Sequence, residues 1–282
     1  MSNDQLICGS HVLSLAGEPL IMGILNVTPD SFSDGGEFFP VAAAVEHALT
    51  MVAEGAAIID IGGESTRPGA PAVSPEEQIR RVEPVIRQLT RQIKVPISID
   101  TTNSRVAQAA LDAGATVVND ISALRFDPAL ASLVSRCNVP VILMHMLGTP
   151  RTMQQCPKYE DVVREVKTFL AERIEFAVSA GINPSQIVID PGIGFGKTVQ
   201  HNLRLIKHVR EFIDLAPVLV GPSRKTFIGK VLHLESPSER LFGTAAAVAW
   251  CVAAGVQIIR VHDVKAIKHI AQMTAALRNV GE

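Results

Sequence analysis

The chain has 282 residues, of which 47% are hydrophobic but only 4% aromatic. This length suits one large α/β barrel or two smaller domains, and the aliphatic composition is typical of buried parallel strands surrounded by helices. A formal net charge of −2, with no run of Lys or Arg longer than two residues, excludes the basic surface that a nucleic-acid partner would need.

The cysteines and the N-terminal segment indicate where the protein works. The four cysteines lie far apart without a C-x-x-C pair, which favours reduced thiols over a zinc cluster or a disulfide framework. The first residues lack a basic stretch followed by an apolar core, and the apolar stretches elsewhere are too short or too interrupted to cross a bilayer. We therefore expect a soluble, cytoplasmic protein with no membrane partner.

Residues 6–15 alternate weakly in polarity before turn-like residues 16–19, which predicts a short N-terminal β-hairpin that closes one end of the fold. From residue 20 onward, apolar runs suited to buried strands alternate with segments of helical spacing. The predicted strands are 20–27, 58–62, 97–100, 117–121, 139–145, 187–190, 218–220 and 257–261. The predicted helices are 41–53, 75–92, 104–113, 128–136, 161–180, 202–213, 237–253 and 264–280.

Two of the predicted helices begin with strong capping signals. Ser74 and Ser236 each precede a proline and are followed three residues later by glutamate, the pattern of a helix N-terminus. Eight successive β-then-α units without a composition break predict a single (β/α)8 TIM barrel, one domain over residues 1–282. A doubly wound sheet is the alternative.

The segment 187–197, IVIDPGIGFGK, looks like a buried strand that delivers a carboxylate to a loop. The apolar run stops at Asp190 and Pro191, and three glycines follow. The ending Gly196-Lys197-Thr198 is reminiscent of a phosphate-binding P-loop, but that motif needs glycine where Pro191 stands, so we reject it. Long segments follow the first, second, fifth and seventh strands, which places the working face at the strands' C-terminal ends.

Polar residues end nearly every predicted strand. They are Asn26, Gly62-Gly63-Glu64, Asp100, Asn119-Asp120, His145, Asp190, Ser223-Arg224-Lys225 and Arg260-Val261-His262. Taken singly, each could cap a helix or close a turn, and we expect such roles for Asp120, Ser104 and Glu64. Taken together, an amide, two carboxylates, a lysine, an arginine and a histidine aimed at one axis indicate a functional site.

Several of these residues lie in recognisable motifs. LNVTPDSFSDGG (25–36) and GGESTRPG (62–69) resemble the two signature segments of the dihydropteroate synthase family. The resemblance covers essentially the whole chain and continues, in order, through 98–101, 118–120, 190–197, 221–225 and 260–262.

The resemblance implies a transferase of folate synthesis that joins 4-aminobenzoate to 6-hydroxymethyl-7,8-dihydropterin diphosphate, giving 7,8-dihydropteroate and diphosphate. It also implies Mg²⁺ as cofactor and a homodimeric enzyme that is a sulfonamide target. The implied residues are Asp100, Asn119, Asp190 and Lys225 for the pterin, with Asp100, Asp190 and Lys225 catalytic; Asn26, Arg260 and His262 for the diphosphate, with Asn26 also the metal ligand; and Phe32, Thr66, Arg67, Pro68 and Ser223 for 4-aminobenzoate.

The expected chemistry is dissociative, because loss of diphosphate leaves a positive charge that the electron-rich dihydropterin can delocalise and nearby carboxylates can stabilise. Two other functions share a pterin pocket: a corrinoid-dependent methyltransferase domain and an inert pterin-binding paralogue. A methyltransferase needs no diphosphate site, whereas Asn26, 223–225 and 260–262 supply one.

The Ala-rich segment 243–253, with Trp250, has more small and apolar residues than a solvated helix needs, which agrees with a dimer.

Overall fold

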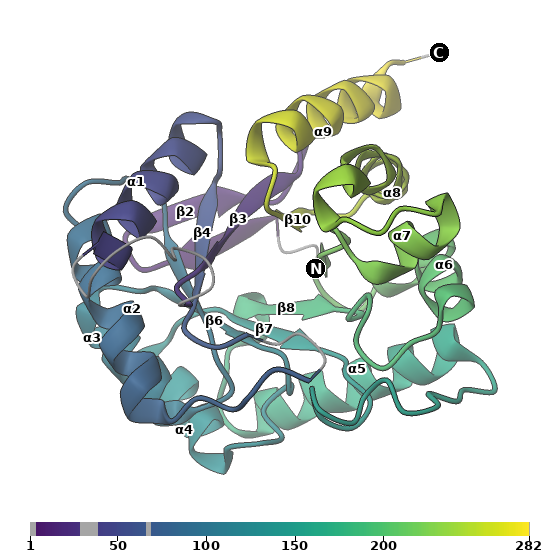
Figure 1. Cartoon of the computed structure of the whole chain (residues 1–282). Coiled ribbons are helices and arrows are strands. Elements are labelled where there is room, and N and C mark those ends of the chain that lie inside the picture. The colour runs from purple at the N-terminus through teal and green to yellow at the C-terminus, as the bar shows by residue number, and fades with distance from the viewer. Residues whose placement is uncertain (1–3, 29–38, 66–68, 282) are drawn as a thin grey trace.

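The computed structural model describes residues 4–28, 39–65 and 69–281, which form a barrel of parallel strands surrounded by helices (Figure 1). The barrel strands are β3 (Leu20–Asn26), β4 (Ile58–Gly62), β5 (Ile97–Asp100), β6 (Val117–Asp120), β7 (Val141–Met144), β8 (Ile187–Asp190), β9 (Leu219–Val220) and β10 (Ile258–Val261). Both faces of β4 are buried along its whole length, as its unbroken apolar character predicts.

The strand order confirms the predicted barrel. The sheet runs β8-β7-β6-β5-β4-β3-β10-β9, and all of its pairings are parallel. A further parallel bridge between Ile189 and Val218 joins the two outer strands, where the Ile189 N–H donates to the Pro217 carbonyl at 2.9 Å. This closure makes the doubly wound alternative wrong.

The predicted hairpin is present and closes the N-terminal end of the barrel. It consists of β1 (Gln5–Cys8) and β2 (His11–Ser14), which pair antiparallel. Its buried side chains pack on a layer of inward-facing residues that we call the barrel floor: Met22, Ile58, Val117, Ile142, Val188, Leu219 and Ile258. Because this floor is apolar, polar chemistry is confined to the opposite end of the barrel.

The helices form the outer layer (Figure 1). They are α1 (Phe39–Ala53), α2 (Pro75–Leu89), α3 (Ser104–Ala113), α4 (Pro128–Cys137), α5 (Val162–Ser179), α6 (Val199–Lys207), α7 (Thr226–Leu232), α8 (Leu241–Ala254) and α9 (Val264–Asn279). None of the helices in the described ranges is both long and apolar enough to cross a membrane.

Two helix predictions need correction, and one helix was missed. Helix α6 ends at Lys207, and a separate 3₁₀ turn, Val209–Phe212, occupies the rest of the predicted segment. Residues Pro237–Arg240 likewise form a 3₁₀ turn before α8. Helix α7 was not predicted, because it is short and contains Gly229, a poor helix former. That glycine is needed for packing, since a Cβ there would lie 2.5 Å from the Leu234 carbonyl oxygen.

The capping predictions are confirmed at Ser74, whose hydroxyl accepts from the Glu77 N–H at 3.3 Å. The Ser236 capping box is also present, but it starts the 3₁₀ turn rather than α8 itself. The predicted role of Ser104 is wrong: Asn103 caps α3, accepting from the Arg105 N–H at 3.0 Å.

Candidate active site

The C-terminal ends of the barrel strands form one rim, which we call the barrel mouth. Because all eight strands are parallel, the residues that end them lie at this same end of the barrel. Asn26 ends β3, Asp100 ends β5, Asp190 ends β8, and Asn119 and Arg260 lie one residue before the ends of β6 and β10. The structure thus brings together residues that span more than 230 positions of the sequence.

A hydrogen-bonded cluster of four side chains lies inside the mouth. Arg260 donates from Nε to Asp60 Oδ2 at 2.6 Å and from Nη2 to Asp100 Oδ2 at 2.7 Å. Asn119 donates from Nδ2 to the same Asp60 Oδ2 at 3.0 Å. A predicted diphosphate residue and two predicted pterin residues therefore belong to one network, which we call the Arg260 cluster.

Asp60 is the member of this cluster that the sequence analysis missed. Its side chain is fully buried in the middle of β4. The available signal was a lone carboxylate inside an otherwise apolar run, since such a charge is costly to bury unless it has partners.

Burial shifts the pKa values of two carboxylates and a lysine at the mouth toward neutrality. It raises the pKa of Asp100 to about 7, although Arg260 opposes the shift. It raises the pKa of Asp190 to about 6, although the carboxylate accepts from the Gly192 N–H at 2.7 Å. Burial and then the nearby charge of Arg260 lower the pKa of Lys225 to about 8. Perturbed groups gathered in this way are typical of functional sites.

The loop after β8 carries an aromatic ring to Lys225. The Lys225 ammonium lies 4.1 Å from the centre of the Phe195 ring, a cation–π distance. Buried Lys197 holds this loop by donating from Nζ to the Phe195 carbonyl at 2.9 Å, and Nζ also lies 2.9 Å from His145 Nδ1. His145, one of the polar strand-end residues, is thus engaged in holding the loop.

His262 and Ser223 lie against each other on neighbouring strand ends. The Ser223 hydroxyl oxygen accepts from the His262 backbone N–H at 3.2 Å and lies 3.0 Å from His262 Nδ1. Burial lowers the pKa of His262 to about 3, with the charge of Arg260 adding to the effect. The imidazole is therefore neutral at pH 7 in the ligand-free protein, where it can donate one N–H to an anion.

Two polar strand-end residues close turns, as predicted. Asp120 accepts from the N–H groups of Ser122 at 2.7 Å and Leu124 at 2.6 Å. Glu64 accepts from the Val73 N–H at 2.9 Å and from Gln78 Nε2 at 3.1 Å. Both contacts fix the backbone of loops that border the mouth.

The predicted 4-aminobenzoate residues are placed only in part. Ser223 is described, whereas Phe32, Thr66, Arg67 and Pro68 lie outside the described residues. Among the described residues, no three His, Cys, Asp or Glu side chains gather into a group that could hold a metal ion.

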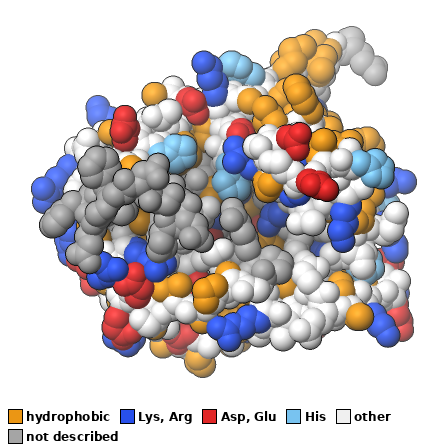
Figure 2. Space-filling view, in the orientation of Figure 1, with side chains coloured by type: hydrophobic (Ala, Val, Ile, Leu, Met, Phe, Trp, Pro, Cys, Tyr) orange, Lys and Arg blue, Asp and Glu red, His pale blue; other side chains and the backbone are white. Residues whose placement is uncertain are grey.

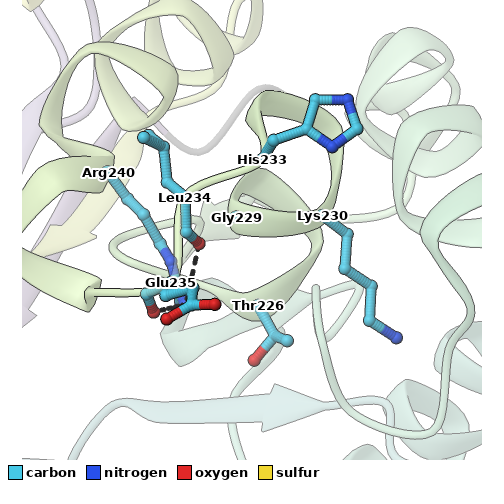
Figure 3. Close-up of a pocket in the computed structure, with 7 residues that line it drawn as sticks. All are labelled: Thr226, Gly229, Lys230, His233, Leu234, Glu235 and Arg240. Carbon is cyan, nitrogen blue, oxygen red and sulfur yellow. Dashed lines mark hydrogen bonds between the residues drawn. The ribbon is translucent and has the colours of Figure 1, made fainter.

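A pocket lies beside α7 (Figure 3). This cavity of about 440 Å³ is lined by Thr226, Gly229, Lys230, His233, Leu234, Glu235 and Arg240. Arg240 donates to the carbonyls of Arg224 at 3.0 Å and Glu235 at 2.6 Å, so its guanidinium fastens the chain around α7. None of the predicted site residues that the structure describes lines the pocket, and we assign the chemistry to the barrel mouth.

The fold and the mouth together define a class of protein: a (β/α)8-barrel enzyme whose C-terminal rim brings together carboxylates, an amide, a lysine and an arginine. The family model described as "Pterin binding enzyme" matches residues 22–262. The dihydropteroate synthase of Synechocystis sp. is 48% identical over 258 residues, covering 91% of this chain and 89% of that protein. The chain therefore belongs to the dihydropteroate synthase family, which confirms the resemblance of its motifs.

Solved structures of relatives agree with this membership. Xanthomonas albilineans dihydropteroate synthase with 4-aminobenzoic acid has a TM-score of 0.93 and 46% sequence identity, with 99% of each chain covered. The same enzyme in complex with 7,8-dihydropteroate has a TM-score of 0.90 and 44% identity, covering 98% of this chain and 100% of that one.

Proposed function

We propose that this protein is a dihydropteroate synthase, which condenses 6-hydroxymethyl-7,8-dihydropterin diphosphate with 4-aminobenzoate and releases diphosphate. The observation that carries the proposal is the Arg260 cluster, buried at the mouth of a barrel of this family beside Asp190 and Lys225. The Xanthomonas albilineans relative, solved with 4-aminobenzoic acid and with 7,8-dihydropteroate, supports the same substrates and product.

The pterin ring is assigned to Asp100, Asn119, Asp190 and Lys225. A dihydropterin presents several N–H donors at its edge, and carboxylate and amide oxygens are suited to accept from them. Lys225 supplies donors for the ring's acceptors, while Phe195 beside it offers an aromatic surface. Ligand N–H groups favour the ionised carboxylates, so pterin binding should lower the raised pKa values of Asp100 and Asp190.

The reaction is proposed to be dissociative. The C–O bond to the diphosphate breaks first, the oxygen keeps the electron pair, and the ring delocalises the positive charge left on the methylene carbon. A carboxylate about 4 Å from that charge stabilises it by roughly 4 kcal/mol at an effective dielectric constant of 20. The amine nitrogen of 4-aminobenzoate then attacks the carbon and loses a proton. Oxygen scrambling in labelled substrate without 4-aminobenzoate would support this order, and a strict requirement for the amine before any scrambling would refute it.

The diphosphate is assigned to Asn26, Arg260 and His262, together with Mg²⁺. Arg260 already shares its charge with two carboxylates, so a divalent cation would supply charge that this side chain alone cannot. Asn26 Oδ1 and Asp100 Oδ2 lie near each other at the mouth, since each would be 3.9 Å from a Cβ placed on Gly62. An amide oxygen is a ligand type that Mg²⁺ accepts alongside phosphate and water.

The metal proposal predicts that EDTA abolishes activity and that Mg²⁺ restores it. Asn26→Ala should raise the Mg²⁺ concentration needed for half-maximal activity, whereas the Ser98→Ala variant, altered deeper in the barrel, should not. Unchanged Mg²⁺ dependence in Asn26→Ala would remove that residue as the metal ligand.

A homodimer is proposed through α8 and α9, which pack side by side. These helices expose large apolar side chains, among them Phe242 at 84% and Leu277 at 65%. Hydrophobic side chains gather over α9 in Figure 2. Analytical ultracentrifugation of the wild type and Phe242→Glu tests this: a dimer that the substitution dissociates supports the proposal, and a monomeric wild type refutes it.

The free cysteines support the further proposal that the enzyme is cytoplasmic.

Incubation of the purified protein with both substrates and Mg²⁺ tests the function. We expect 7,8-dihydropteroate and diphosphate in equal amounts, and competition by a sulfonamide that resembles 4-aminobenzoate. Pterin binding without diphosphate release would instead support the inert paralogue, and methyl transfer from methyltetrahydrofolate would support the corrinoid-dependent enzyme.

A further inference from the structure

Asp60 is a buried carboxylate that is not among the predicted site residues, and it has no assigned role so far. It lies in β4 between Ile59 and Ile61, and its side chain is fully buried. Burial of a carboxylate destabilises the folded protein unless hydrogen bonds and opposite charges offset the lost hydration. The contacts of Asp60 therefore indicate its role.

One oxygen of Asp60 makes both of its hydrogen bonds. Oδ2 accepts from Arg260 Nε at 2.6 Å and from Asn119 Nδ2 at 3.0 Å. The other oxygen, Oδ1, is buried and has no hydrogen-bond partner among the described residues. The two donors come from β10 and β6, on either side of β4 in the sheet, so a single acceptor fixes the separation of two side chains on different strands.

These two donors serve different parts of the proposed reaction. Asn119 is assigned to the pterin, and the bond to Asp60 orients its amide with Nδ2 toward Asp60 and the carbonyl oxygen away from it. Arg260 is assigned to the diphosphate, and its Nη2 is bound to Asp100. Asp60 holds the guanidinium separately, through Nε, so this contact does not depend on the bond between Arg260 and Asp100.

We propose that Asp60 is a positioning residue that, through Oδ2, holds Arg260 and Asn119 in a fixed relation and so couples the pterin pocket to the anion site. The inference rests on the proposed function. It predicts that loss of this acceptor weakens binding of the pterin and of its diphosphate without a comparable effect on 4-aminobenzoate.

Three variants separate positioning from packing. Asp60→Ala removes the acceptor, whereas Asp60→Asn can keep an oxygen at the Oδ2 position and its amino group at the position of Oδ1. Ser98→Ala is the matched control, because Ser98 is the register partner of Asp60 on β5, is fully buried and has a hydroxyl without a hydrogen-bond partner among the described residues.

We expect Asp60→Ala to lower kcat/KM for the pterin diphosphate roughly 10- to 100-fold, as loss of supporting contacts around a site commonly does. The KM for 4-aminobenzoate, measured at saturating pterin diphosphate, should change less than about threefold on the same reasoning. Asp60→Asn should recover most of the loss, and Ser98→Ala should resemble the wild type. Equal effects of Asp60→Ala and Ser98→Ala, or equal weakening of both substrates, would overturn the proposal.

Two further measurements keep the test decisive. Calorimetry with 6-hydroxymethyl-7,8-dihydropterin, which lacks the diphosphate, should show weaker binding to Asp60→Ala than to Ser98→Ala even if the wild type forms no dihydropteroate. A wild-type protein that forms no dihydropteroate would refute the proposed function. The calorimetry would still test whether Asp60 positions Asn119. If Asp60→Ala does not fold, a wild-type crystal structure with pterin diphosphate must retain both bonds to Asp60, and loss of either bond would overturn the proposal.

Discussion

Replacement of Arg260 by methionine should destabilise the protein strongly, because it leaves two buried carboxylates without their shared cation. The side chain of Arg260 is 17% exposed, and those of Asp60 and Asp100 are 0% and 10% exposed. Breaking a buried ion pair by removing one partner typically costs about 3–5 kcal/mol. We expect Arg260→Met to lose a free energy of unfolding in this range at pH 8, measured by urea denaturation without ligands.

The loss should depend on pH in a defined direction. Burial already raises the pKa of Asp100 to about 7 while Arg260 pulls it down, so removal of Arg260 raises it further. When a carboxyl group has a higher pKa in the folded than in the unfolded protein, the free energy of unfolding decreases as the pH rises through the folded-state pKa. The difference in free energy of unfolding between wild type and variant therefore grows between pH 6 and pH 8. It should be smaller at about pH 5.5, where the folded variant keeps Asp100 protonated.

Arg224→Met is the matched control for this experiment. Arg224 also pairs with an aspartate, Asp263, but the two side chains are 35% and 23% exposed. Such a pair is worth at most about 1 kcal/mol, because water screens it. A loss in Arg260→Met no larger than that in Arg224→Met, or one that is the same at both pH values, would refute the view that Arg260 neutralises a buried acidic pair.

Two further predictions concern activity and the loop after β8. The rate kcat/KM should rise from about pH 6 to pH 7 as Asp190 and Asp100 ionise, and fall above about pH 8 as Lys225 loses its proton, measured in buffers of constant ionic strength. Gly192→Ala should destabilise the protein by more than about 3 kcal/mol, because at φ +69° a Cβ would lie 1.9 Å from the His145 carbonyl oxygen. Gly17→Ala, at φ +86° with no atom within 4 Å of the new Cβ, should cost only about 1–2 kcal/mol in urea denaturation.

The opposite trends would contradict these expectations. An acid limb centred near pH 4 would mean that the two carboxylates are not buried in the working enzyme, since unperturbed carboxyl groups titrate at about that pH. Similar losses in the two glycine variants would mean that the loop after β8 does not pass against the end of β7.

The barrel could be predicted from local patterns, because each strand is a short apolar run with turn signals on both sides. Strands β4, β5 and β8 have the predicted bounds, since a polar residue or a glycine ends each one. The break after α6 and the helix α7 could not be predicted in this way. Both depend on contacts with distant parts of the chain, such as the close packing of Gly229 on the Leu234 carbonyl.

The residues of the candidate site that lie at or near strand ends could be predicted from the sequence, whereas the others could not. Asp60 lies two residues before the end of β4, and its partner Arg260 is 200 positions away in the sequence, so no local pattern reveals the pair. The neutral state of His262 follows from burial among other cations and is likewise invisible in the sequence. The assignments of Asp100, Asn119, Asp190 and Lys225 to the pterin stay predictions that the shared barrel mouth supports.

A crystal structure of the protein with 6-hydroxymethyl-7,8-dihydropterin diphosphate tests these assignments most directly. We predict that the bicyclic ring lies inside the barrel mouth, with its N–H groups on Asp100 and Asp190 and the diphosphate beside Arg260 and His262. A ring bound elsewhere, for example in the pocket beside α7, would contradict it.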